Sequence, residues 1–121
     1  MKRRLLVPVD DPSGTRVAGH FGRAPYFAII DIDGGQVVRK VVEPNRGEHT
    51  GGRGHAHDNV FAFNPHVVIV YAMGPRGLSS FQMANVAVLQ ANSQYLDEVV
   101  ASYLRGELEE LTQGCLEAHY S

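Results

Sequence analysis

The sequence has a single cysteine, no long apolar run and no excess of charge of either sign. Cys115 alone cannot form an intramolecular disulfide, which is typical of a reducing cytoplasm. No apolar run approaches the roughly 20 residues of a membrane-spanning helix, so no membrane partner is expected. There are 11 Lys and Arg against 13 Asp and Glu, a net charge of −2 without a basic block. Charge therefore gives no reason to expect nucleic acid as a partner.

The N-terminus begins as a secretory signal peptide does, with Lys and Arg before an apolar stretch. That stretch stops at Pro8, short of the roughly 7–15 residues that the apolar region of a signal needs. The chain has 121 residues, 44% hydrophobic and 20% charged, which suits one compact core. We therefore expect one cytoplasmic domain over residues 1–121, with 112–121 as a mobile tail.

Five strands and three helices are predicted along the chain. The apolar and β-branched runs predict strands at 5–9, 26–32, 36–43, 67–71 and 86–89. Apolar residues at helical spacing predict helices at 56–63, 75–84 and 96–104, and Leu108 and Leu111 predict one further turn. The order βββαβαβα predicts an α/β protein with a five-stranded mixed sheet.

The strand order predicts where a ligand binds. Hairpins make the second strand antiparallel to the first and third, and we expect the fourth to run parallel to the first. The carboxyl ends of strands one, three, four and five then share one edge of the sheet with the start of strand two. That edge would carry the loops 10–23, 45–57, 72–77 and 90–93, which hold most of the glycines and histidines. Open α/β sheets bind their ligands at such an edge.

The segment HFGRAPYF, residues 20–27, combines an imidazole, a glycine and a guanidinium just before a strand. One interpretation is that His20 ligates a soft or borderline metal and that Arg23 pairs with an anion. The other is that the segment is structural: the two phenylalanines anchor the core, Gly22 permits the turn and His20 caps it.

The loop over 45–58 holds four glycines and three histidines. Glycine-rich backbone before a helix can present N–H groups to an anion, and the histidines are candidate metal ligands, although surface histidines are the competing interpretation. The loop lacks the Lys-Ser/Thr ending of a nucleotide-binding P-loop. The candidates are Gly51, Gly52 and Gly54 for an anion, and His49, His55 and His57 for a metal.

The segment AMGPRG, residues 72–77, is a second loop that leads into a predicted helix. The helix start at Gly74 favours an anion, which Arg76 could clamp, unless the segment is only a compact turn. Met73 is either a soft sulfur ligand or, more often, a gap-filling core residue. Cys115 and His119 are four residues apart, a spacing that suits two metal ligands but does not close a site.

The aspartates raise the possibility of a Mg²⁺ site for phosphoryl transfer. Asp10 and Asp11 follow the first strand, whereas Asp31 and Asp33 close the hairpin at the opposite edge. We therefore expect these carboxylates not to converge, and to be ordinary loop and turn residues.

These motifs occur in the order seen in the dinitrogenase iron–molybdenum cofactor biosynthesis family, which the chain resembles over roughly residues 4–111. The shared features are HFGRAPYF at 20–27, GGRG at 51–54, GPR at 74–76 and GEL at 106–108. The resemblance implies a ribonuclease H-like α/β fold. It also implies the binding or carrying of metal–sulfur clusters rather than catalysis.

The resemblance carries over to His20 and Arg23, which lie in the shared motif. His55 and His57 depart from it, because relatives generally have apolar or small residues there. A cysteine near the C-terminus recurs in some relatives, which favours Cys115 as a ligand.

The expected function is non-enzymatic binding of an anionic metal–sulfur cluster: the iron–molybdenum cofactor, its precursor or a related Mo, Fe or Cu sulfide. The expected partners are the proteins that donate and accept this cluster. The alternative is a small regulatory module that binds a plain anion, and a further one is a metal-dependent nuclease or phosphatase. The predicted cofactor-binding residues are His20, Gly22, Arg23, Gly51, Gly52, Gly54, Gly74 and Arg76, and the predicted metal ligands are His20, His49, His55, His57 and Cys115.

Overall fold

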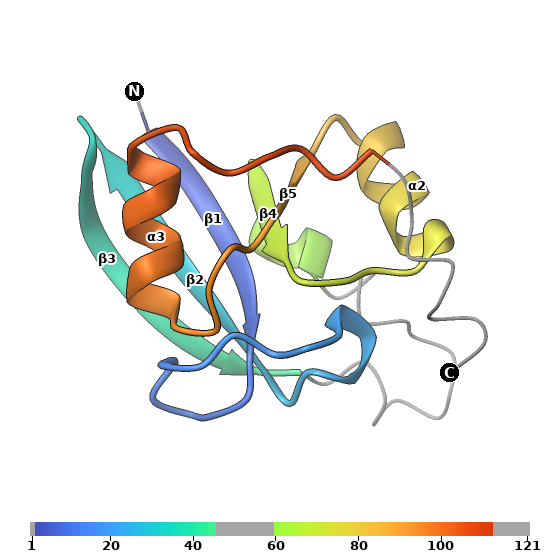
Figure 1. The fold of residues 1–121 in the computed structure, drawn as a ribbon, viewed down its shortest axis with the longest axis horizontal. Coiled ribbons are helices and arrows are strands. Elements are labelled where there is room, and N and C mark those ends of the chain that lie inside the picture. Colours follow the sequence, from blue (N-terminus) through green and yellow to red (C-terminus); the bar gives the residue numbers. More distant parts are fainter. Residues whose placement is uncertain (1, 46–59, 113–121) are drawn as a thin grey trace.

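The computed structural model describes residues 2–45 and 60–112, in which five strands form one mixed sheet (Figure 1). The strands are β1 (Lys2–Val9), β2 (Tyr26–Asp33), β3 (Gln36–Pro44), β4 (Val67–Val70) and β5 (Ala87–Gln90). Their order across the sheet is β3-β2-β1-β4-β5. The α-helices of the described part are α2 (Pro75–Met83) and α3 (Leu96–Leu104), and η1 (Phe21–Arg23) and η3 (Phe61–Phe63) are 3₁₀ turns. The α/β class and the five-stranded mixed sheet are confirmed, and the closer ribonuclease H-like assignment stays a prediction.

The strand directions agree with those expected. β2 runs antiparallel to β1 and β3, and β4 runs parallel to β1 and β5. The tight turn between β2 and β3 has Gly34 at φ 61° and Gly35 at φ 79°. Both angles are in the left-handed region, which glycine enters at little steric cost. The carboxyl ends of β1, β3, β4 and β5 therefore meet at one edge of the sheet.

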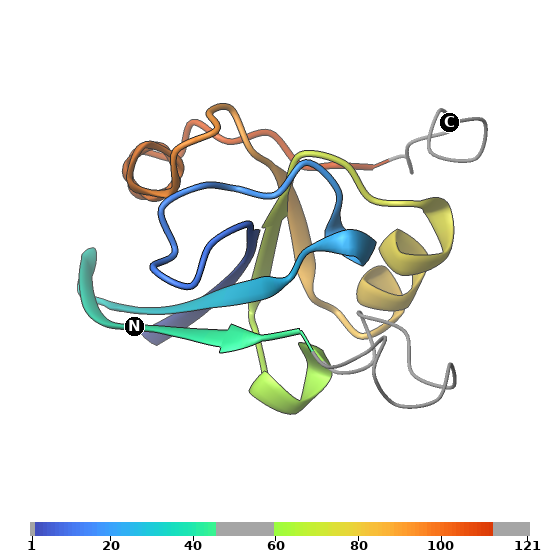
Figure 2. The same cartoon turned by 90° about the horizontal axis from the view of Figure 1, so that it is seen from below.

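Helices cover both faces of the sheet (Figure 2). Side chains alternate along β1, so that Leu6 faces the core under α2 while Leu5 faces the core under α3. Phe81 of α2 and Val99 of α3 are fully buried in these two cores. Neither helix of the described residues is long and apolar enough to cross a membrane.

The expectation for the segment before β4 is met only in part. Residues 56–59 lie outside the described part, and the remainder of the expected helix is the 3₁₀ turn η3. Asn64 ends this turn in the left-handed conformation, with φ 55°.

The helical turn expected through Leu108 and Leu111 is wrong, because this segment is extended. The Gln90 N–H donates to the Glu109 oxygen and the Leu111 N–H donates to the Val88 oxygen, each at 2.8 Å. The segment thus satisfies backbone groups at the open edge of β5. Leu108 packs on the α3 side and Leu111 on the α2 side, as an odd spacing requires in an extended chain.

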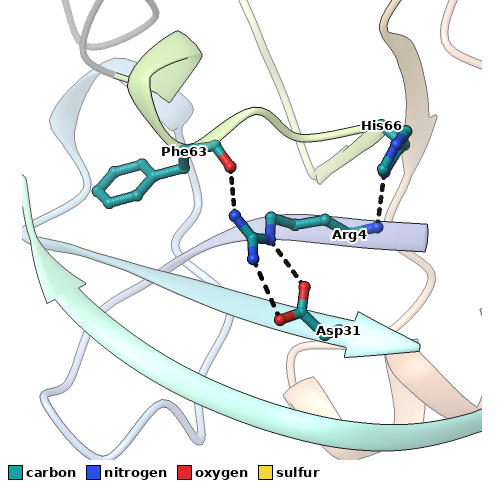
Figure 3. A network of polar contacts seen from close by, with 4 residues as sticks. All are labelled: Arg4, Asp31, Phe63 and His66. Atoms are coloured by element: carbon teal, nitrogen blue, oxygen red, sulfur yellow. Dashed lines mark hydrogen bonds and ion pairs between the residues drawn. The ribbon is translucent and has the colours of Figure 1, made fainter. Parts of the chain in front are cut away.

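A partly buried ion pair joins β1, β2 and η3 (Figure 3). The Arg4 guanidinium donates to both carboxylate oxygens of Asp31, from Nε at 2.7 Å and from Nη2 at 3.2 Å. Its Nη1 donates to the Phe63 oxygen at 2.8 Å. The backbone N–H of Arg4 donates to Nδ1 of His66 at 2.9 Å, and the His66 N–H donates back to the Arg4 oxygen. One arginine therefore connects three segments that are distant in the sequence.

We predict that Gly14→Ala destabilises the protein more than Gly34→Ala. Both glycines have a left-handed φ, 67° and 61°, which costs an alanine about 1 kcal/mol or more. A Cβ on Gly14 would also lie 2.7 Å from Cγ2 of Val42, a stiff β-branched side chain, whereas a Cβ on Gly34 meets nothing within 4 Å. Urea denaturation of both variants measures the difference, and equal losses of stability would contradict the steric contact.

We predict that Asp31→Asn lowers the free energy of unfolding by about 1 kcal/mol at neutral pH, since the pair is partly exposed. The hydrogen bond from Arg4 is the main cause that holds the pKa of Asp31 below its ordinary value of 3.8. The stability from this lowered pKa is complete above pH 3.8 and is lost as the pH falls through the pKa of the folded state.

The variant should therefore lose less stability than the wild type on acidification below about pH 4. The control is Asp10→Asn, which removes an exposed carboxylate at the other end of β1. Acid denaturation curves that are alike for Asp31→Asn and the wild type would refute the assignment.

Candidate functional site

The candidate site lies at the sheet edge where β1, β3, β4 and β5 end and β2 begins. Val9 is opposite Tyr26, Tyr26 is opposite Pro44, and Val70 is opposite Gln90. The η1 turn and the segment that enters α2 both belong to this end of the molecule (Figure 1). The predicted edge is confirmed for the described residues, and residues 46–57 of the loop after β3 lie outside them.

Phe21 fixes the position of η1 at this edge. Its ring is buried, with ring centroids 5.5 Å from Phe27 of β2 and 5.7 Å from Phe81 of α2. Its N–H donates to the Ala72 oxygen at 3.2 Å, and this bond joins η1 to the loop after β4. The residues on either side of Phe21 are thereby held next to the segment that begins α2.

His20 is the N-cap of η1, where its Nδ1 accepts a hydrogen bond from the Gly22 N–H at 3.2 Å. This confirms the capping role that the sequence left open. A neutral imidazole whose Nδ1 accepts carries its proton on Nε2, so Nε2 is a donor in this conformation. Metal ligation through Nε2 would first require the proton to move to Nδ1 and the Gly22 bond to break. As the residue stands, it suits an anion better than a metal.

The backbone of η1 has no donor left for a ligand. The N–H groups of residues 21–24 are all bonded within the protein: Phe21 to Ala72, Gly22 to His20, Arg23 to the His20 oxygen and Ala24 to the Phe21 oxygen. The Arg23 side chain, by contrast, is exposed. This segment therefore offers a ligand two side chains, those of His20 and Arg23.

Nothing within the folded chain requires a glycine at position 22 for steric reasons. Its φ lies outside the left-handed region, and a Cβ there would meet the His20 ring at 3.6 Å, an ordinary contact. The turn itself therefore does not require glycine, contrary to the structural interpretation of this residue.

The start of α2 supplies backbone donors. Gly74 is its N-cap, and no side chain of the described residues caps this helix. Pro75 at the first position has no N–H. The first helical hydrogen bond is the one from the Leu78 N–H to the Gly74 oxygen. The N–H groups of Arg76 and Gly77 come before it and therefore have no acceptor within the helix. A Cβ on Gly74 would meet nothing within 4 Å, and the Arg76 side chain is exposed. The arrangement favours an anion.

Two other expectations about this edge are settled by burial and hydrogen bonding. Met73 is only 1% exposed, so it fills the core rather than offering its sulfur. Asp11 accepts from the Thr15 hydroxyl at 2.7 Å and from the Thr15 and Arg16 N–H groups. These bonds, the one from the hydroxyl first, lower the pKa of Asp11. Asp31 is bound to Arg4 at the other end of the sheet, so the expectation that the aspartates do not converge is confirmed.

Asn45 is a positioning residue that the sequence did not single out. It is 7% exposed, its Nδ2 donates to the Ala24 oxygen at 2.8 Å, and its N–H donates to the Pro25 oxygen. The end of β3 is thereby tied to the end of η1. An asparagine after a strand is common, and no sequence signal indicates these long-range acceptors.

Several predicted site residues lie outside the described part of the chain. They are Gly51, Gly52, Gly54, His49, His55, His57 and Cys115. Within residues 2–45 and 60–112, no group of three or more His, Cys, Asp or Glu is placed to hold a metal ion.

The chain is similar to known proteins over most of its length. The sequence profile of the family described as dinitrogenase iron-molybdenum cofactor matches residues 3–106. An uncharacterised protein of Methanocaldococcus jannaschii is 29% identical over 108 residues, which are 88% of this chain and 89% of the relative.

Two solved structures share the fold. A Methanocaldococcus jannaschii protein provisionally described as a dinitrogenase superposes with a TM-score of 0.78 at 17% identity, over 93% of this chain and 98% of its own. The apo form of the orange protein from Desulfovibrio gigas superposes with a TM-score of 0.76 at 23% identity, over 92% and 94% of the two chains.

We predict that His20→Ala lowers the free energy of unfolding by about 1 kcal/mol, because it removes the cap of η1. His20→Asn should lose much less, since a short amide oxygen can accept the Gly22 N–H as Nδ1 does. Thermal and urea unfolding of the two variants measures this difference. Equal stability of His20→Ala and the wild type would show that the cap contributes nothing.

Proposed function

Because the chain belongs to the dinitrogenase iron-molybdenum cofactor family, we propose that it binds and carries an anionic metal–sulfur cluster without catalysing a reaction on it. The proposed cargo is the iron–molybdenum cofactor, its precursor or a related molybdenum, iron or copper sulfide. The observation that carries the proposal is the bond between the Phe21 N–H and the Ala72 oxygen. It holds the His20–Arg23 turn beside the open start of α2.

The donors at this edge suit the surface of such a cluster. A metal–sulfur cluster presents negatively charged sulfides, which accept hydrogen bonds. Arg23 and Arg76 provide exposed guanidinium groups, and His20 provides Nε2–H. The Arg76 and Gly77 N–H groups add the positive end of the α2 dipole. Charge-assisted hydrogen bonds of this kind are about twice as strong as neutral ones.

Binding through hydrogen bonds to the sulfides suits a carrier, which must release its cargo. His20 in its capped form donates to an anion rather than ligating a metal. Metal ligation by His49, His55, His57 or Cys115, and contacts from Gly51, Gly52 and Gly54, are part of the proposal as additions to this shell. A carrier also requires partners, and we propose a protein that donates the cluster and another that accepts it.

The carboxylates favour this proposal over phosphoryl transfer. Asp11 is engaged by Thr15 and Arg16, and Asp31 is engaged by Arg4 at the opposite end. A metal-dependent nuclease or phosphatase needs carboxylates that converge on its metal ions.

We predict that the anaerobically purified protein takes up tetrathiomolybdate, or the iron–molybdenum cofactor, with sulfide charge-transfer bands in the visible spectrum and near-stoichiometric metal. Arg23→Gln and Arg76→Gln should each weaken the binding about tenfold, because each removes one charge-assisted contact, about 1.4 kcal/mol. His20→Asn should weaken it too, since it keeps the cap and removes Nε2–H.

The control is Arg105→Gln, which removes one positive charge from an exposed pair with Glu107. It should bind as the wild type does. Uptake of neither probe, together with thermal protection by sulfate or phosphate, would replace the proposal by the plain-anion module. Binding that Arg23→Gln, Arg76→Gln and His20→Asn all leave unchanged would place the cluster elsewhere on the protein.

A further inference from the structure

A second groove lies at the opposite end of the sheet, around the ion pair of Figure 3. It has a volume of about 440 Å³, within the usual range of small-molecule sites. The groove is lined by the start of β1, the end of β2 and the bulged part of β3, together with Asn64 and His66. None of the residues expected to bind the cluster lines it.

The groove is predominantly cationic. Four cationic side chains line it against one carboxylate: Lys2, Arg3, Arg4 and Arg39 against Asp31. Both oxygens of Asp31 already accept bonds from Arg4. Arg39 lies opposite Asp31 on β3, is exposed and makes no ion pair with any residue that the structure describes. Its charge is therefore available to a ligand.

A bulge in β3 gives this groove its apolar wall. The register shifts between Asp31 and Ile32, so that Asp31 pairs with Arg39 while Ile32 pairs with Val37, and Val38 is the extra residue. Val38, the extra residue, and its neighbour Arg39 both line the groove. Val38 is 62% exposed, so its apolar side chain is open to contact with a ligand in the groove.

His66, which also lines the groove, supplies a neutral donor. Nδ1 of His66 accepts the Arg4 N–H, so the neutral imidazole carries its proton on Nε2. Two other carboxylates are nearby. Asp33 lies opposite Lys2 in the pairing of β1 with β2, and Glu43 lines a smaller hollow of about 130 Å³ that shares Arg4, Asp31 and Arg39 with the groove. An anion is therefore favoured in the groove, where four cations face Asp31, rather than in the smaller hollow that Glu43 lines.

We propose that this groove binds a small organic anion, with its phosphate or carboxylate group beside Arg39 and its apolar part against Val38. The cations supply charge-assisted hydrogen bonds, and Val38 gains by being covered. This site does not depend on the proposed cluster site, and a ligand here would give the protein a second, separate binding function.

The test uses adenosine monophosphate and inorganic phosphate as probes, since the first joins a phosphate to a flat, partly apolar base. In amide NMR spectra at low salt, adenosine monophosphate should shift Val38, Arg39, Asn64 and His66 and leave Gly22 and Gly74 unmoved. It should bind at least tenfold more tightly than phosphate, because phosphate cannot cover Val38. Arg39→Gln should weaken its binding about tenfold.

Arg105→Gln, which removes the same charge outside the groove, should bind adenosine monophosphate as the wild type does. No shift at the groove amides, or shifts that Arg39→Gln leaves unchanged, would overturn the site. Equal affinities for the two probes would overturn the apolar half of the proposal. Because the groove and the cluster edge report through different amides, failure of one is distinguishable from failure of the other.

Discussion

The candidate cluster site depends on the burial of one ring, that of Phe21. It packs against Phe27 of β2 and Phe81 of α2, so both a strand and a helix fix it. With the ring in place, the Phe21 N–H reaches the Ala72 oxygen, and the turn it belongs to is held beside the start of α2. Side chains that bind anions from exposed turns need such rigid support, because each must be ordered before it contributes.

At the other end of the sheet the pair of Arg4 and Asp31 has the corresponding role. It uses both oxygens of the carboxylate and the Phe63 oxygen, and so joins β1, β2 and η3. Because Asp31 is engaged in this way, it does not also engage Arg39 by an ion pair. The same interaction that stabilises the fold thus leaves the nearby groove with unbalanced positive charge.

The elements of the fold could largely be predicted from local sequence, but pairings at the edges could not. Runs such as Val67–Val70 and the stripe of α3 have the periods of a buried strand and of an amphipathic helix, and Gly34-Gly35 indicates the hairpin. The charged start of β1 has no such pattern. Lys2–Arg4 belong to the strand because they pair with residues of β2. Leu108 and Leu111 suit a helix by spacing, and only the open edge of β5 explains their extended conformation.

The location of the site could be predicted from the sequence, but the chemistry of its residues could not. Strand order alone put HFGRAPYF and AMGPRG at one edge, which the register confirms. The state of His20 follows instead from a contact two residues away, because the Gly22 N–H occupies Nδ1 and leaves a proton on Nε2. Whether a histidine in a motif donates to an anion or ligates a metal therefore depends on the backbone group that bonds to its ring. If the cluster contacts His20 through a sulfide, its release from His20 requires only the exchange of a hydrogen bond, and no metal–ligand bond to His20 has to break.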